Sequence, residues 1–202
     1  MCLLVGACVR SVTKKRRGGD MMRLEEFRKL YMEKVRRKDY VQKENEWHAK
    51  MLCYCRKRVL EEPYEIIADK DPVMIGQLVH IGVDNVVEYE SVVYKKEIED
   101  YIIYGTPDLF MNGELVEIKF TVYPPKQPRE HDMMQLKIYM WLLGVDYGYL
   151  WYLSPFGSKE FEVEGGYEDE DIVKLIEEPR YPMWPWECKN CSLKSECEHM
   201  RW

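Results

Sequence analysis

The stretch from Tyr104 to Phe120, YGTPDLFMNGELVEIKF, constrains the fold most strongly, because it predicts two strands joined by a tight turn. Asn112-Gly113 between apolar segments is a strong signal for a two-residue hairpin turn of type I′. Counting outward from the turn places Asp108 opposite Glu117, and opposed side chains lie roughly 5 Å apart at Cβ. Lys119 lies two residues beyond Glu117, on the same face of its strand. Two carboxylates and an ammonium group therefore converge on one spot.

The opposed carboxylates suit a divalent metal site. Like charges in this arrangement repel each other, and the apolar neighbours favour burial, which makes unpaired charge costly. Mg²⁺ or Mn²⁺ would remove the penalty, polarise a phosphate and lower the pKa of a bound water. Lys119 would neutralise charge that develops on the phosphorane and help to position the water. The alternative is an ordinary hairpin with an exposed acid pair.

The rest of the chain predicts helices around consecutive strands. Apolar residues at helical spacing predict helices over 21–38 and 44–60, Asp71-Pro72 begins a third, 130–143 forms a fourth, and 167–178 is a short acidic helix. Besides the hairpin, strands are expected at 86–94, 98–104, 147–153 and 159–164. This order indicates an α+β fold, with a central mixed sheet flanked by helices.

The charge of the chain is divided unevenly. The 202 residues carry a net charge of -6, but residues 1–60 contribute +10 and the remaining 142 contribute -16. Such asymmetry suggests a basic surface for a polyanion, with solvated helix faces as the alternative. No apolar run is long enough to span a membrane, and the first residues, MCLLVGACV, are too short for a signal peptide and lack its basic leader, so a cytoplasmic location is expected.

The seven cysteines are expected to serve metal or redox chemistry, since no secretory signal suggests disulfides. Cys188, Cys191 and Cys197 place three thiols within ten residues. A tetrahedral Zn²⁺ site or an iron–sulfur cluster would need a fourth ligand. The candidates are His199, Cys53 and Cys55.

These motifs resemble a known nuclease superfamily. Gly105-Thr-Pro-Asp108 with Glu117-Ile-Lys119 resembles the PD-(D/E)XK nucleases, and Gln135-Leu-Lys-Ile-Tyr139 is similar to the Q-x-x-x-Y motif of their RecB-like branch. His80, four residues after Gly76, looks like the upstream histidine of that branch. The resemblance implies a restriction-endonuclease-like core in which His80, Asp108, Glu117 and the backbone carbonyl of Ile118 bind Mg²⁺ or Mn²⁺. Gln135 and Tyr139 would orient Lys119 or the DNA strand; the alternative is a polar face on a core helix.

A second motif resembles the iron–sulfur members of this branch. The segment that begins Tyr54-Cys55-Arg56 is similar to their Tyr-Cys-Pro-Arg-Lys signature, although the proline is missing and Cys53 is a competing thiol. The resemblance implies that Cys55 joins Cys188, Cys191 and Cys197 to hold a [4Fe–4S] cluster, with [2Fe–2S] and Zn²⁺ as alternatives. Cys2 and Cys8 are then free thiols.

Taken together, the chain resembles the CRISPR-associated RecB-like exonucleases, the fourth Cas family. The resemblance implies a Mg²⁺- or Mn²⁺-dependent exodeoxyribonuclease that acts on single-stranded DNA from the 5′ end and trims ends during spacer acquisition, with the CRISPR integrase proteins as partners. The alternatives are a DNA repair nuclease of the same branch and a non-catalytic iron–sulfur adaptor that binds DNA. Aromatic residues near the site either stack unpaired bases or belong to the core: Tyr104, Tyr123 and Trp141.

The domain organisation follows from these motifs. Residues 1–20 form a basic flexible arm, 21–65 hold N-terminal helices with one cluster cysteine, 66–178 form the nuclease core, and 179–202 are the cluster-binding tail.

Overall fold

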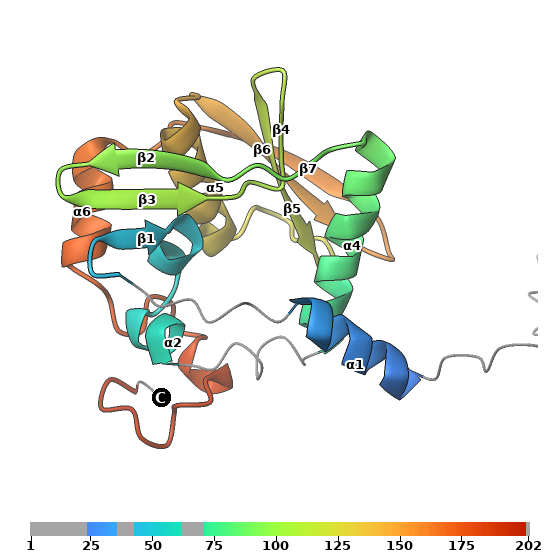
Figure 1. The fold of residues 1–202 in the computed structure, drawn as a ribbon, viewed down its shortest axis with the longest axis horizontal. Coiled ribbons are helices and arrows are strands. Elements are labelled where there is room, and N and C mark those ends of the chain that lie inside the picture. The colour runs from blue at the N-terminus through green and yellow to red at the C-terminus, as the bar shows by residue number, and fades with distance from the viewer. Residues whose placement is uncertain (1–23, 36–42, 62–70, 201–202) are drawn as a thin grey trace, which may run out of the picture. The chain divides into compact units, whose positions relative to one another are not determined.

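A computed structural model describes residues 24–35, 43–61 and 71–200 (Figure 1). The chain divides into two units, residues 1–35 and 36–202, and the described part of the first is helix α1 (Leu24–Val35). The predicted basic arm of residues 1–20, with Cys2 and Cys8, lies outside the described residues. A search of the described helices found none with the length and apolar character that a membrane crossing requires.

The strands of the second unit form two sheets, and each contains parallel and antiparallel pairs, as expected for a mixed sheet. The three-stranded sheet has the order β1 (Glu46–His48), β3 (Tyr101–Gly105), β2 (Tyr94–Ile98). The four-stranded sheet has the order β4 (Leu109–Met111), β5 (Glu114–Phe120), β6 (Tyr147–Leu153), β7 (Lys159–Glu164). The parallel pairs are β1 with β3 and β5 with β6.

Helix α5 (Glu130–Leu143) connects the parallel strands β5 and β6 and packs against strands of both sheets (Figure 1). Nine of its fourteen residues are buried, so it is enclosed on most sides rather than along one stripe. Gly144 ends the helix in the left-handed conformation, with φ of 68°, which glycine adopts without strain. The polar side chains of α5 therefore lie inside the fold, where they need partners.

Helix α4 (Asp71–Val87) packs against the face of β5 that carries Val116 and Ile118. Val83 and Val87 pack against a small cluster made of Leu109, Val116 and Ile118. His80 lies one turn before Val83, so this packing holds the imidazole beside the two hairpin strands. The remaining elements are η1 (Ala49–Cys53), α2 (Arg56–Glu61), α6 (Asp169–Glu177) and η2 (Cys188–Asn190).

The hairpin of β4 and β5 has the predicted register. Met111 pairs with Glu114, and Leu109 pairs with Val116. Asn112 and Gly113 have φ of 53° and 84°, as a type I′ turn requires.

The predicted helix over 44–60 is wrong. This segment contains a strand, a 3-10 helix and the short α2. The carbonyl of Asn45 accepts the N–H of Ile102 at 2.8 Å, and Trp47 is buried. Pairing with a strand more than fifty residues away overrides the local helical spacing.

The strands expected at 86–94 and 98–104 are also corrected. Helix α4 continues through Val87, and the chain turns at Glu88, which has φ of 54°. Strand β2 then ends at Ile98, and a two-residue turn at Glu99-Asp100 leads into β3. That turn contains neither glycine nor asparagine, so the sequence carries no strong turn signal there.

Gly105 ends β3 where α5 approaches most closely. A Cβ atom at this position would lie 2.5 Å from Cδ2 of Leu142 and 2.8 Å from Cε1 of Tyr139. The glycine of the Gly-x-x-Asp motif is therefore required by the ring of the tyrosine in the Q-x-x-x-Y motif.

Replacing Gly105 with alanine should lower the free energy of unfolding by about 1–3 kcal/mol, because Tyr139 and Leu142 must move. Gly82→Ala is the matched control: nothing lies within 4 Å of that Cβ on α4, and alanine favours the helix by about 0.5–1 kcal/mol. Urea unfolding of both variants measures the difference. Equal stability of the two variants would contradict the close packing at Gly105.

Candidate active site

Asp108 is fixed against the hairpin by its own carboxylate. It directly precedes β4, and its Oδ2 accepts the N–H of Ile118 at 2.7 Å. The strand pairing ends with Leu109 opposite Val116, which brings Asp108 alongside Glu117. The hairpin thus delivers one carboxylate from each strand to the same place.

Glu117 is buried, and only one of its two carboxylate oxygens has a hydrogen-bond partner. Its side chain is 2% exposed, and Oε1 accepts a hydrogen bond from Nζ of Lys119 at 2.6 Å. Its Oε2 is buried with no hydrogen-bond partner. Leaving such an oxygen without a partner is costly in a low-dielectric interior. This atom is therefore a candidate ligand for a cation.

The pKa values show how the two carboxyl groups differ. Burial and the charge of Asp108 raise the pKa of Glu117 to about 7. Burial opposes ionisation of Asp108 too, but the hydrogen bond and charge of His80 outweigh it, so the pKa of Asp108 lies below its usual value. Burial disfavours the ammonium form of Lys119, but the charges of Glu117 and Asp132 outweigh it and raise its pKa. Lys119 therefore stays protonated.

His80 contacts Asp108 from α4. Its Nδ1 lies 3.2 Å from Oδ1 of Asp108. Burial would lower the pKa of His80, but the hydrogen bond and charge of Asp108 outweigh burial and raise it. The structure thus brings together His80, Asp108 and Glu117, the three side chains predicted as metal ligands, with Ile118 between Glu117 and Lys119 on β5.

Gln135 and Tyr139, the two residues predicted on one helix face, form a chain of hydrogen bonds that ends at Lys119. Oε1 of Gln135 accepts a hydrogen bond from Nζ of Lys119 at 2.9 Å, and Nε2 of Gln135 donates to the hydroxyl of Tyr139 at 3.3 Å. Both residues are buried on α5. Gln135 therefore fixes the position of the ammonium group, and Tyr139 fixes Gln135.

Two residues of this network were missed by sequence reasoning. Asp132 is 3% exposed, its Oδ1 lies 4.0 Å from Nζ of Lys119, and its Oδ2 accepts a hydrogen bond from the hydroxyl of Tyr152 at 2.7 Å. Asp132 precedes Gln135 by three residues and so shares its face of the helix, which is the one sequence signal available. Tyr152 carries no such signal, because only the pairing of β5 with β6 brings it close.

The donor set of this site fits Mg²⁺ or Mn²⁺. Carboxylate oxygens suit both ions, and an imidazole is compatible with Mn²⁺. Within the described ranges, however, no three His, Cys, Asp or Glu side chains are already arranged to hold a metal ion. His80 and Asp108 pair with each other instead, so binding would require these side chains to turn toward the ion.

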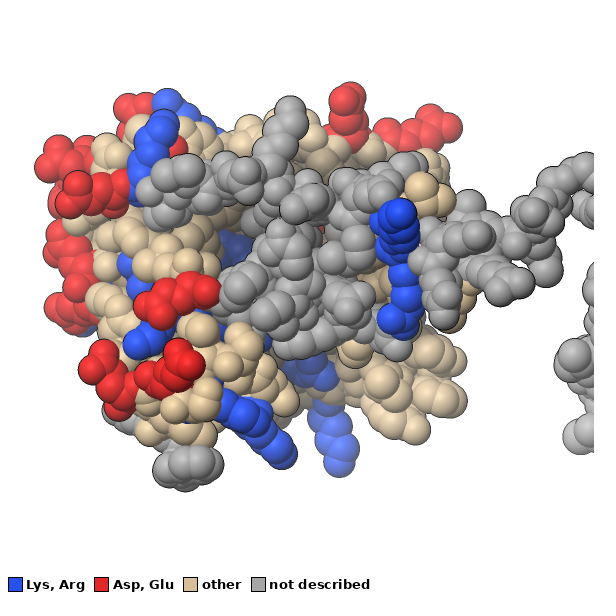
Figure 2. Space-filling view, turned by 60° about the horizontal axis from the view of Figure 1, so that its bottom comes forward, with Lys and Arg blue, Asp and Glu red and all other residues tan. Residues whose placement is uncertain are grey.

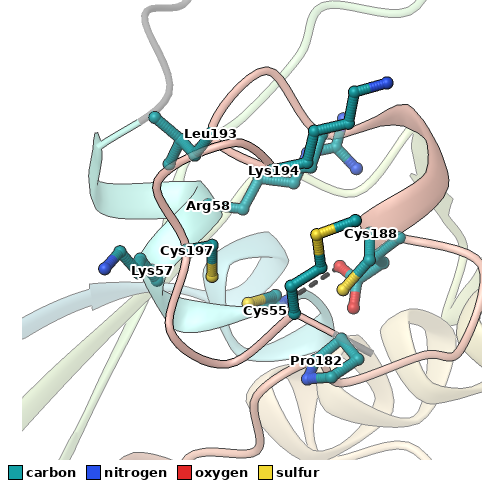
Figure 3. Close-up of a pocket in the computed structure, with 11 residues that line it drawn as sticks. Cys55, Lys57, Arg58, Pro182, Cys188, Leu193, Lys194 and Cys197 are labelled. Carbon is teal, nitrogen blue, oxygen red and sulfur yellow. Dashed lines mark hydrogen bonds between the residues drawn. The ribbon is translucent and has the colours of Figure 1, made fainter. Parts of the chain in front are cut away.

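The cysteines predicted as cluster ligands line one cavity. Figure 3 shows Cys55, next to α2, facing Cys188 and Cys197 of the tail, and Cys191 also lines the cavity. Glu187, which is 1% exposed, joins the two segments, because Oε1 accepts the N–H of Cys55 at 2.8 Å and Oε2 accepts the N–H of Trp184 at 2.7 Å. One buried carboxylate thus fixes Cys55 beside the tail.

Cys53 and His199, the other candidates for the fourth metal ligand, lie outside the cavity. Cys53 does not line the cavity; it is fully buried, its thiol donates to the carbonyl of Ala49 at 3.5 Å, and burial raises its pKa. His199 does not line the cavity either and stacks on Tyr181, with ring centroids 4.6 Å apart. Four thiols at one cavity are the donor set of an iron–sulfur cluster or a zinc site.

The described basic residues of the N-terminal part are only partly available to a polyanion. Arg56 is buried, with its guanidinium 3.9 Å from the centroid of the Trp47 ring and a hydrogen bond to the carbonyl of Leu175 at 3.0 Å. Lys57 and Arg58 line the cysteine cavity (Figure 3).

Two carboxylates opposed across a hairpin, one of them buried, a lysine two residues after the second and a supporting glutamine are the features of a PD-(D/E)XK-type site, and comparison with known proteins agrees. The chain is 29% identical to the CRISPR-associated exonuclease Cas4 of Saccharolobus solfataricus over 181 residues, which is 78% of this chain and 90% of that protein. The crystal structure of SSO0001 aligns with a TM-score of 0.75 and 25% identity over 88% of this chain and 97% of that one. No protein-family model matches the chain.

A weaker likeness, with a TM-score of 0.38 and 14% identity, links 63% of this chain to the alkaline exonuclease LHK-Exo of Laribacter hongkongensis. The predicted resemblance to the CRISPR-associated RecB-like nucleases and the predicted fold class are confirmed. The similarity to the Cas4 exonuclease of Saccharolobus solfataricus supports a nuclease.

Proposed function

We propose that the chain is a Mg²⁺- or Mn²⁺-dependent exodeoxyribonuclease that acts on single-stranded DNA in the 5′→3′ direction. The observation that carries this proposal is the buried oxygen of Glu117 that lacks a partner, beside a second carboxylate and a protonated lysine. The similarity to an exonuclease supports the reaction class. His80, Asp108, Glu117 and the carbonyl of Ile118 would hold the ion.

The side chains have separable tasks in phosphodiester hydrolysis. A divalent cation, when bound, supplies charge that polarises the phosphate and lowers the pKa of a bound water. Lys119 presents a permanently charged ammonium group to the phosphate oxygens, where negative charge grows during attack. Glu117 and Gln135 accept hydrogen bonds from this group and hold it in place, and Asp132 adds a negative charge 4.0 Å away. Pre-positioned charge is effective because it needs no rearrangement during the reaction.

The cysteine cavity is proposed to hold a [4Fe–4S] cluster through Cys55, Cys188, Cys191 and Cys197. The four thiols and the buried Glu187 support this proposal, while [2Fe–2S] and Zn²⁺ fit the same donor set. A metal bound between the segment at Cys55 and the tail would tie together parts of the chain more than 130 residues apart. Binding would then contribute directly to the stability of the fold.

The charge distribution restricts where DNA can lie. Figure 2 shows acidic side chains gathered along the left edge of one face, the side on which Figure 1 shows α6. The first turn of α6 alone holds Asp169, Glu170 and Asp171. Phosphates would be repelled there, so the DNA path is expected to avoid α6.

The biological setting is proposed from similarity. Trimming of DNA ends during spacer acquisition, together with the CRISPR integrase proteins, would follow from the likeness to Cas4. On this proposal, residues 66–178 are the nuclease core and 179–202 are the tail that binds the cluster. The same site would serve a repair nuclease outside CRISPR, and a vestigial site would leave an adaptor that binds DNA.

Lys119→Ala and Asp108→Ala should each reduce cleavage of single-stranded DNA in Mn²⁺ by about 100-fold or more, because the first removes a positive charge beside the reacting phosphate and the second removes a proposed ligand of the metal ion. Glu114→Ala is the control, since Glu114 is an exposed carboxylate on the same strand. Substrates labelled at the 5′ or the 3′ end report the polarity. Undiminished cleavage by both variants would refute the site, and no cleavage by any protein would favour the adaptor.

Cys55→Ser and Cys188→Ser should lose bound iron, the absorption near 400 nm and thermal stability, since each removes one cluster ligand. Cys53→Ala should keep the metal because that thiol lies outside the cavity. Iron and zinc analysis after anaerobic purification, with thermal unfolding, measures these effects. A colourless protein that contains one zinc ion per chain would contradict the cluster and indicate a zinc site.

A further inference from the structure

Two large aromatic rings are stacked on each other while most of their surface faces solvent. Tyr123 and Phe156 have ring centroids 4.9 Å apart and an angle of 16° between their planes. They are 66% and 67% exposed, and the neighbouring Val122 is 60% exposed. Isolated exposed apolar side chains are common, but a stacked and exposed pair presents flat rings to a ligand.

The two loops that carry these rings are fixed to each other. Oγ of Ser154 donates to the carbonyl of Val122 at 2.7 Å and accepts the N–H of Phe156 at 3.0 Å. The N–H of Thr121 donates to the carbonyl of Leu153 at 3.0 Å. The backbone around both rings is therefore held in place before any ligand arrives, which lowers the entropic cost of binding.

The surroundings of the rings are cationic. The segments 121–129 and 154–159 contain no Asp or Glu, and their charged residues are Lys126, Arg129 and Lys159, all exposed. The guanidinium of Arg129 donates to Oγ1 of Thr121 at 3.0 Å, and the ammonium of Lys159 donates to the carbonyl of Pro125 at 3.0 Å. These bonds attach two positive charges to the segment that carries Tyr123.

The rings also lie close to the candidate active site along the chain. Lys119 is on β5, and Tyr123 follows it by four residues, so their Cα atoms are at most about 14 Å apart. Phe156 follows the end of β6, the parallel neighbour of β5, by three residues. Both loops thus leave the sheet at the ends of β5 and β6 that follow the lysine.

We propose that Tyr123 and Phe156 form a stacking platform for an unpaired base of the DNA strand whose backbone enters the active site, with Lys126, Arg129 and Lys159 contacting its phosphates. The platform rests on the proposed nuclease function and adds a binding site to it. A flat ring pair surrounded by cations matches a ligand with flat bases and a negative backbone. Paired bases are enclosed within a duplex, so the platform favours single strands.

Trp141 and Tyr104 are the other two aromatic residues considered from the sequence, and neither is an exposed, stacked ring. Trp141 is buried, and its Nε1–H donates to Oδ1 of Asp169 at 2.7 Å. The ammonium of Lys96 lies over its ring, 4.1 Å from the centroid. Tyr104 is half-buried in β3. Of the three, only Tyr123 offers an exposed and stacked ring.

The test measures DNA affinity without cleavage, on the full chain and without added Mg²⁺ or Mn²⁺. Fluorescence anisotropy compares a labelled oligothymidine with an abasic strand of the same length. Tyr123→Ala and Phe156→Ala should each weaken binding of oligothymidine by about tenfold, because a stacked base contributes roughly 1–3 kcal/mol. Phe156→Trp, which keeps an aromatic ring at this position, should bind as the wild type does. Tyr147→Ala, at the opposite end of β6 and also exposed, is the matched control.

The abasic strand separates stacking from other effects. The platform predicts that the alanine variants bind the abasic strand as the wild type does. If the alanine variants bind oligothymidine as tightly as the wild type does, the proposal is overturned, and the exposed rings would instead indicate a binding surface for a protein. An equal loss on both strands would overturn it as well, because the effect would not depend on bases. Binding of this kind by a chain that cuts no DNA would refute the nuclease function while keeping the platform.

Discussion

The ion pair between Glu117 and Lys119 is the interaction on which the candidate site depends. Its carboxylate is buried, and a buried pair is stable only when its remaining hydrogen-bonding capacity is satisfied. Gln135 accepts a second hydrogen bond from the lysine and Asp132 adds a negative charge 4.0 Å away, whereas Oε2 of Glu117 stays without a partner. The local energetics thus favour a cation at the place where hydrolysis of a phosphodiester would use one. The oxygen without a partner lowers the stability of the fold, and the same oxygen is available to bind a cation.

Helix α5 connects this pair to the rest of the molecule. Its ring at Tyr139 packs over Gly105, so two motifs far apart in the sequence are in direct contact. Near its start, His131 packs against Trp186 of the cysteine-bearing tail, with ring centroids 5.0 Å apart. The Nε1–H of Trp184 donates to the carbonyl of Cys53 at 2.7 Å. A metal held by the tail would therefore stabilise the neighbours of the helix that positions Lys119.

The sequence predicted those features that depend on local geometry. The Asn112-Gly113 turn fixes the hairpin register, so the convergence of Asp108, Glu117 and Lys119 could be derived by counting. Features that depend on distant pairing could not be derived in this way: β1 is a strand because it pairs with β3, and Tyr152 reaches Asp132 because β6 lies beside β5. The choice of Cys55 over Cys53 rested on family resemblance, and the burial of Cys53 away from the cavity supplies a physical reason for it.

The most direct test of the central claim is a titration of the protein with Mn²⁺, in which loss of the EPR signal of free Mn²⁺ counts bound ions. One site per chain is predicted for the wild type and for Glu114→Gln, and it should be absent in Glu117→Gln. Because the pKa of Glu117 is raised to about 7, a proton must leave on binding, so the affinity should fall as the pH is lowered through 7. Equal Mn²⁺ binding by the three proteins, independent of pH, would contradict a metal site at Glu117.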